Sequence, residues 1–206
     1  MQERAARTRS ALIQAAALEF EHRGYEGASL SRISETALTS IGGLTFHFRT
    51  KRALADSVGS ACRASTARHV TEALTSPDPP MVALGSLVTT LMRRLETSVE
   101  ARAAARLRRE RLASGGGGRS EAHTWAPALK VLLARAHATG SLRADVAPGV
   151  AEALIVRLVE GTELSTCRRP AGTRTDCCPH AASAEQVWDL LLTAIAPPGA
   201  GAGAGA

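Results

Sequence analysis

The stretch SLSRISETALTSIGGLTFHFRTKRAL, residues 29–54, decides the fold of this chain. Its apolar residues recur at helical spacing, since Leu30, Ile33 and Ala37 occupy positions i, i+3 and i+7. Thr39 and Ser40 then interrupt the pattern, and Ser40 is a good N-cap for a second short helix. The stretch therefore predicts two very short helices joined by a tight turn, a helix-turn-helix.

The second short helix carries two adjacent glycines, Gly42 and Gly43. Each glycine is expected to cost about 1 kcal/mol relative to alanine inside a helix. The absence of side chains makes sense if the helix must press its backbone against something large. Leu44 and Phe48, four residues apart, are expected to face inward, and Thr50 to cap the helix that begins next. Such a helix suits a DNA major groove.

The same residues carry a resemblance to a known family. The pattern A-x-T-S-x-G-G-L-x-F-H-F-x-x-K-x-x-L over residues 37–54 resembles the signature of the TetR family of transcription regulators. The pattern E-F-x-x-x-G-Y-x-G-A-S-L over residues 19–30 extends it upstream. The resemblance implies an all-α protein with an N-terminal three-helix helix-turn-helix domain and a C-terminal helical bundle for ligand binding and dimerisation.

Four positions depart from that signature. Leu38 replaces the usual turn glycine, and Thr39 replaces an apolar turn residue. Ile41 stands where many members carry lysine, and Thr45 where most carry a phosphate-contacting tyrosine. These departures bear on DNA affinity or target sequence more than on the fold.

Composition agrees with a helical, DNA-binding protein. The chain has 206 residues and only six aromatic residues (three Phe, two Trp, one Tyr). Its net charge is +6, carried almost wholly by arginine, because Lys51 and Lys130 are the only lysines. Residues 1–70 hold ten Lys/Arg against six Asp/Glu, so this end contributes +4 of the +6. A local basic excess supports a polyanionic partner.

Targeting signals and cysteine spacing favour a cytoplasmic protein. The chain opens on polar and basic residues, and no apolar run approaches the ~18 residues needed to span a bilayer. The four cysteines lack a framework-like spacing, so reduced thiols are expected. We therefore expect no membrane association.

Composition shifts suggest the domain borders. We expect a helix-turn-helix DNA-binding domain over 1–50, a connecting helix over 51–76, a ligand-binding and dimerisation domain over 77–197 and a flexible tail over 198–206. The run S-P-D-P-P over 76–80 stops the connecting helix. The glycine run over 115–118 indicates a loop and not a P-loop, because no strand precedes it and no Gly-Lys-Ser/Thr follows.

Two arginine clusters leave alternatives open. Arg4, Arg7 and Arg9 belong either to a solvated, frayed terminus or to an arm reaching phosphates or the minor groove. A helix over 100–112 carries five more arginines, for which a solvated face is the first expectation and a face toward DNA or the first domain the alternative.

The last two long helices have apolar stripes. Within TetR-like proteins these helices pair into a four-helix dimer interface, so the resemblance assigns that task to residues 148–166 and 183–196. A short recognition helix reads only a few base pairs, and twofold pairing doubles the contact. For the last helix, ordinary packing within one chain is the alternative.

A closer resemblance is to the γ-butyrolactone receptor group of antibiotic-production regulators. It is carried by A-R-L over 105–107, Trp125, L-x-x-D-V over 142–146, G-T over 161–162 and P-A-G over 170–172. It implies that Trp125 stacks on a small lactone or furan and that Thr162 donates a hydrogen bond to it. The alternatives are a core anchor for Trp125 and local helix bonding for Thr162. The basic charge is more typical of the group's pseudo-receptors.

The pocket chemistry also follows from the residues themselves. Val88, Leu91, Met92, Leu129 and Leu133 offer an apolar lining in which methionine adapts to irregular shapes. Such a lining favours a small, mostly apolar, neutral effector. No cofactor is expected.

The sequence thus predicts a homodimeric regulator that binds a palindromic operator on double-stranded DNA, most simply a repressor released by a small effector and controlling secondary-metabolite genes. One alternative is a TetR-like repressor of an efflux or catabolic gene that senses a different molecule. Another is an interaction module or heterodimer partner with weakened DNA binding. An enzyme or metal site would have to use C-C-P-H over 177–180, whose adjacent cysteines strain zinc geometry. The residues expected to meet DNA are Arg4, Ser29, Ser40, Gly42, Gly43, Thr45, Phe46, His47, Lys51 and Arg52.

Overall fold

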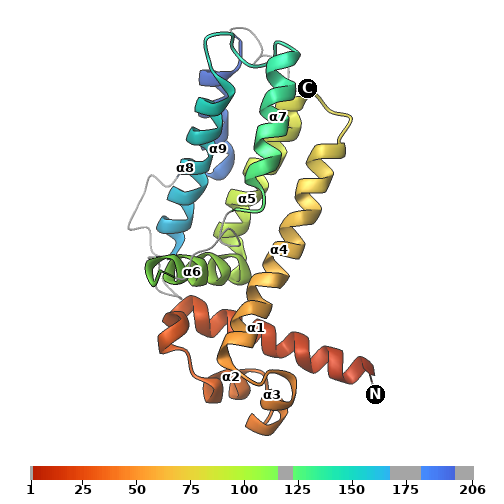
Figure 1. Cartoon of the computed structure of the whole chain (residues 1–206), viewed down its shortest axis with the longest axis vertical. Coiled ribbons are helices and arrows are strands. Elements are labelled where there is room, and N and C mark those ends of the chain that lie inside the picture. The colour runs from red at the N-terminus through yellow and green to blue at the C-terminus, as the bar shows by residue number, and fades with distance from the viewer. Residues whose placement is uncertain (1, 116–122, 168–181, 198–206) are drawn as a thin grey trace. The chain divides into compact units, whose positions relative to one another are not determined.

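The computed structural model describes residues 2–115, 123–167 and 182–197, and all regular structure in these ranges is α-helical (Figure 1). This confirms the predicted all-α class. Among the described helices, none is both long and apolar enough to cross a bilayer. The helices are α1 (Gln2–Gly27), α2 (Leu30–Thr36), α3 (Ile41–His47), α4 (Lys51–Thr75), α5 (Pro80–Thr97), α6 (Val99–Ala113), α7 (Ala126–Ala138), α8 (Pro148–Cys167) and α9 (Ala184–Ile195).

The described helices divide between two compact units. The first unit contains α1, α2, α3, the part of α4 up to Ser65, and α6. The second contains α4 from Thr66 onward, α5, α7, α8 up to Ser165, and α9. These units do not coincide with the ranges expected from the sequence, because α6 lies beyond residue 77 yet belongs with the helix-turn-helix.

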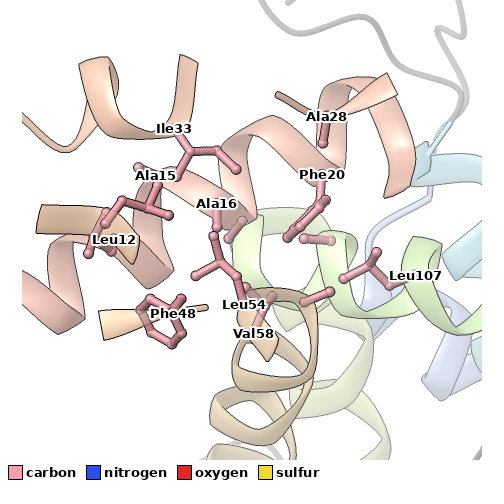
Figure 2. Close-up of a cluster of buried hydrophobic side chains, with 14 residues drawn as sticks. Leu12, Ala15, Ala16, Phe20, Ala28, Ile33, Phe48, Leu54, Val58 and Leu107 are labelled. Carbon is pink, nitrogen blue, oxygen red and sulfur yellow. The ribbon is translucent and has the colours of Figure 1, made fainter. Parts of the chain in front are cut away.

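One hydrophobic core holds the first unit together (Figure 2). α1 and α4 supply its largest share, and α2, α3 and α6 each add residues. Leu44 is fully buried and Phe48 nearly so, as their spacing predicts. The fully buried large residues are Leu12, Phe20, Ile33, Leu44, Leu54 and Val58.

The short helices begin where the sequence predicts. The side-chain oxygen of Ser40 accepts a 3.0 Å hydrogen bond from the Gly43 N–H, which makes Ser40 the N-cap of α3. Thr50 does the same for the Ala53 N–H, also at 3.0 Å, at the start of α4. Gly24 interrupts the helical backbone of α1 with a φ of 70°, a conformation that glycine adopts without steric cost.

Helix α6 packs along α1 through both apolar and charged contacts. Ala101, Ala103, Ala105 and Leu107 are buried, and two of its arginines bind the C-terminal part of α1. Arg102 pairs with Glu21, and Arg106 donates a 2.7 Å bond to the Glu21 carbonyl. Arg111 pairs with Asp56 of α4 at 3.0 Å. The expectation of a solvated arginine face is therefore wrong for these three residues: they bind the first unit, which was the alternative.

The second unit buries the apolar stripes of α5 and α7. Its core also takes Ile155 and Val159 from α8 and Trp188 and Ile195 from α9. Gly85 of α5 allows a close approach, because a Cβ there would lie 2.6 Å from Nε1 of Trp188. A capping box at Ser183 starts α9.

Several sequence expectations fall on residues outside the described ranges. These are the glycines 116–118, the segment 170–172, the cysteine cluster 177–180 and the tail 198–206.

Candidate functional site

Helix α3 turns one residue inward and most of the others outward. Leu44 is fully buried, whereas Ile41 is 45% exposed and Phe46 82% exposed. Gly42 and Thr45 are also exposed, and His47 lies edge-on to Phe46 with ring centroids 5.3 Å apart. The first unit thus presents the outer face of α3 on its surface.

The two glycines of α3 differ in the space that a side chain would find at each position. A Cβ on Gly43 would lie 2.7 Å from Oγ1 of Thr39, so the turn before α3 leaves no room for one. A Cβ on Gly42 would meet nothing closer than Oγ of Ser40, at 3.8 Å. Gly43 therefore serves the fold, while nothing inside the first unit requires Gly42.

The hydroxyl groups around α3 are mostly engaged in local bonds. Ser40 caps the helix, and the Thr45 hydroxyl donates a 3.1 Å bond to the Gly42 carbonyl. Ser29 differs, because it occupies the N-cap position of α2 without a side-chain capping bond. Its backbone N–H instead donates to Glu19.

The basic residues expected to contact phosphates are partly engaged inside the first unit. The Lys51 ammonium donates to the carbonyls of Glu26, at 3.2 Å, and Ala28, at 3.3 Å. It also lies 4.8 Å from the centroid of the Tyr25 ring. Arg52 is exposed and pairs with Asp56 at 3.3 Å. Lys51 thus ties the α1–α2 connection to the start of α4.

The N-terminal arginines lie on α1 and form no separate arm. Arg4 is exposed, and Arg7 pairs with Glu3 at 2.5 Å. Arg9 covers the Phe48 ring at 5.1 Å and bonds to Ser57 at 3.4 Å. Arg9 therefore has a packing role, while Arg4 stays open to a partner.

Sequence reasoning missed one residue of this surface, Arg49, and did not foresee the conformation of a second, Leu38. Arg49 follows α3 directly, is exposed, and forms no ion pair or hydrogen bond with the described residues. Its position between α3 and the cap of α4 was the available signal. Leu38, in the turn before α3, is 95% exposed and has a φ of 51°, in the left-handed region where leucine is rare.

The residues expected to line a ligand pocket lie in the second unit and are buried. Val88, Leu129 and Leu133 are fully buried, and Leu91, Met92 and Trp125 nearly so. The structure thus places each of these side chains in the interior of the second unit.

The surroundings of Trp125 are more polar than the sequence suggests. The His123 ring lies 4.5 Å from the Trp125 ring, and its Nε2 is 3.3 Å from the Glu160 carboxylate. The largely buried Glu163 lies 3.9 Å from Nδ1 of the same His123. The Thr162 hydroxyl donates a 3.0 Å hydrogen bond to the Leu158 carbonyl, one turn earlier in α8. This is the local helix bonding that was the alternative to a bond with a ligand.

Comparison with known proteins decides the family. A sequence profile described as bacterial regulatory proteins, tetR family, matches residues 12–58, which include all of α2 and α3. The helix-turn-helix of this chain is of the TetR family. Proteins of that family are DNA-binding transcription regulators and not enzymes. A search of curated proteins finds no match.

Solved structures extend the likeness beyond the helix-turn-helix. A γ-butyrolactone receptor (ArpA-like protein) is 26% identical, with a TM-score of 0.72 and coverage of 95% of this chain and 91% of that one. A structure concerned with control of antibiotic production by bacterial hormones has 25% identity, the same TM-score, and coverage of 92% and 98%. CprB, a TetR-family protein from S. coelicolor A3(2), has 25% identity, a TM-score of 0.69, and coverage of 93% and 90%.

The second unit also has an exposed apolar face on α8 and α9. Val150, Leu154 and Leu164 of α8 are 64%, 47% and 55% exposed, and Leu190 of α9 is 73% exposed. A Cβ on Gly161, on the same helix, would meet nothing within 4 Å. These residues belong to the two helices expected to form the dimer interface.

Proposed function

We propose that this regulator is a homodimeric repressor that binds a palindromic operator and leaves it when a small effector occupies the second unit. The observation that carries the DNA-binding part is Gly42. An exposed helical glycine costs up to about 1 kcal/mol relative to alanine, and no contact within the first unit requires it. A partner that approaches the backbone of α3 closely would explain why residue 42 is glycine, and a DNA major groove is such a partner.

The reading surface comprises the residues around this glycine. Ser29, Gly42, Phe46 and Arg4 are available at the surface, and Arg49 joins them as a phosphate ligand. Ser40, Gly43 and Thr45 have local roles in α3 and contribute chiefly by shaping it. Arg52 and His47 complete the proposed surface. Lys51 is the least available of the residues proposed to contact DNA, because two carbonyls and a ring already engage it.

Pairing of two copies through α8 and α9 supports the palindromic operator. The exposed Val150, Leu154, Leu164 and Leu190 give these helices an apolar face, and Gly161 permits close approach of another helix. Two copies related by a twofold axis present two α3 helices to half-sites roughly 34–36 Å apart, one turn of the DNA. This proposal accounts for exposed leucines that the single chain leaves uncovered.

For the effector we propose a γ-butyrolactone-type signal or an antibiotic, with secondary-metabolite genes as targets. The support is the similarity to a γ-butyrolactone receptor over most of both chains. The buried set Val88, Leu91, Met92, Leu129 and Leu133 suits an apolar ligand body, and Trp125 offers a flat ring. Release requires that the effector bind the DNA-incompetent state more tightly than the DNA-competent one.

The decisive experiment compares Gly42→Ala with Gly59→Ala on palindromic DNA selected from a random pool by the wild-type protein. Both glycines lie in helices of the first unit; a methyl at Gly42 would meet no close contact, and a methyl at Gly59 would meet only the end of the flexible Arg63 side chain, at 3.1 Å. We expect each variant to be as stable as the wild type or slightly more so. Only Gly42→Ala is expected to weaken DNA binding, by about tenfold, because an added methyl at a packed interface costs about 1–3 kcal/mol.

Two results would count against the proposal. If Gly42→Ala binds DNA as tightly as Gly59→Ala, α3 does not approach DNA at this glycine. If the wild-type protein enriches no sequence and gives no retarded band at low salt, the interaction module becomes the better account.

A further inference from the structure

We propose that this chain recognises thymine in its operator through the 5-methyl group, with Ile41 as the residue that contacts it. The proposal rests on the proposed DNA binding and adds to it the chemistry by which a base is selected. It assigns a specificity role to a residue whose apolar side chain is unusual at this place.

The start of α3 offers an apolar side chain to a base edge. In helix-turn-helix proteins the N-terminal residues of the second helix contact base edges. Here those residues are Ile41, which is 45% exposed, and Gly42, which has no side chain. The two nearest hydroxyl groups each form one bond within α3: Ser40 accepts from the Gly43 N–H and keeps its own proton, and Thr45 donates its proton to the Gly42 carbonyl.

The major groove has one apolar feature that such a surface can read. Only thymine among the four bases presents a methyl group there, and apolar side chains recognise thymine through it. The lack of a close contact around Gly42 lets the helix backbone approach, which brings the adjacent Ile41 within reach of a methyl. Because burying one methyl group contributes about fourfold in affinity, two half-sites contribute about fifteenfold.

The exposure of Ile41 also has no explanation within the first unit. Large exposed apolar side chains concentrate at this end of the unit, where Leu38 is 95% and Phe46 82% exposed. Leu112, at the end of α6 in the same unit, has the same 45% exposure as Ile41 but lies outside the helix-turn-helix. It therefore provides a matched control for the loss of an exposed aliphatic side chain.

The test measures binding of the wild-type protein to its selected palindrome and to versions in which single thymines are replaced by uracil in both half-sites. Uracil keeps every hydrogen-bonding group of thymine and lacks only the methyl. At one symmetric pair of positions we expect affinity to fall about fifteenfold. Replacing cytosine by 5-methylcytosine in a palindrome that carries cytosine at that pair is expected to restore part of the affinity.

Ile41→Ala identifies the residue responsible. It is expected to bind the thymine and uracil palindromes equally, whereas Leu112→Ala is expected to keep the wild-type preference for thymine. Circular dichroism checks that both variants are folded. Equal affinity of the wild-type protein for all thymine and uracil palindromes would overturn the proposal, as would an undiminished thymine preference in Ile41→Ala. If the wild-type protein binds no DNA at all, the proposed function itself fails. This outcome is distinct from equal binding of the thymine and uracil palindromes, which would overturn only the proposal for Ile41.

Discussion

The carboxylate of Glu110 accepts a 2.7 Å hydrogen bond from the backbone N–H of Tyr25, 85 residues earlier in the chain. The same carboxylate accepts a 2.9 Å bond from Nε of Arg106. The first bond fastens the C-terminal half of α6 to the point where the backbone turns at Gly24, and the second, within α6, holds the carboxylate in place. A Cβ on Gly24 would lie 2.2 Å from Oε1 of Glu110, so the turn and the carboxylate fit each other closely.

Glu110→Gln is therefore expected to destabilise the protein by about 1 kcal/mol, because a charge-assisted acceptor is replaced by a neutral one. Urea unfolding followed by circular dichroism measures the change. Glu72→Gln is the matched control, since Glu72 is exposed and pairs only with His69 on its own helix. Equal unfolding midpoints for the two variants would show that the Tyr25 bond contributes little.

Arg49 is expected to contact a DNA phosphate, and Lys51, which the sequence suggested for that contact, is expected to stabilise the first unit instead. Arg49→Ala should lower the slope of log affinity against log salt by about one per subunit, because a phosphate contact is lost. Lys51→Ala should leave that slope unchanged and destabilise the protein by about 1 kcal/mol, since it loses two carbonyl acceptors and a ring contact. Gel shifts at several salt concentrations, combined with urea unfolding, distinguish the two effects. A salt slope reduced by Lys51→Ala would restore its assignment to phosphate.

Leu38→Gly is expected to stabilise the protein by about 1 kcal/mol. An L residue in the left-handed region carries a strain of about 1–2 kcal/mol, glycine carries none, and part of the gain is offset by the greater freedom of glycine in the unfolded chain. The Leu38 side chain is almost fully exposed, so its removal sacrifices little packing. Leu38→Ala retains a Cβ and is expected to change nothing. Thermal unfolding measures both; a lower midpoint for Leu38→Gly would mean that leucine packs in the turn.

Much of the first unit could be predicted from the sequence because its information is local. The spacing of Leu44 and Phe48 determines which side of α3 is buried, and the caps Ser40 and Thr50 act within three residues. The role of α6 could not be predicted, because its arginines find their carboxylates more than 50 residues away. A run of arginines has the same appearance in a sequence whether water or an acidic partner faces it.

The candidate site was predictable to a smaller degree for the same reason. Sequence spacing placed Gly42 and Gly43 together on α3, but only the position of Thr39 shows that one of them is required by the fold. Lys51 matches a family position, yet its bonds to Glu26 and Ala28 depend on how α1 and α2 are connected. The polar surroundings of Trp125 depend on Glu163, a residue 38 positions further on.

Trp125 is expected to report effector binding through its fluorescence. The chain has two tryptophans, so Trp188→Phe leaves Trp125 as the sole emitter and Trp125→Phe leaves Trp188. Titration with candidate lactones and antibiotics should quench the first variant as it quenches the wild type, and should leave the second unchanged. The wild-type protein should lose its DNA at the same effector concentrations. Quenching that persists in Trp125→Phe would place the ligand elsewhere.

Leu154→Glu is expected to convert the protein to a monomer and to abolish binding to the palindrome. Leu154 is 47% exposed on α8, so a carboxylate there is solvated in the single chain but would be desolvated between two apolar faces. Val131→Glu is the matched control, because Val131 is 41% exposed on α7, outside the proposed interface. Size-exclusion chromatography with light scattering gives the mass, and circular dichroism confirms that both variants are folded. A dimer retained by Leu154→Glu, or a dimer lost by Val131→Glu, would show that the copies pair through a different surface.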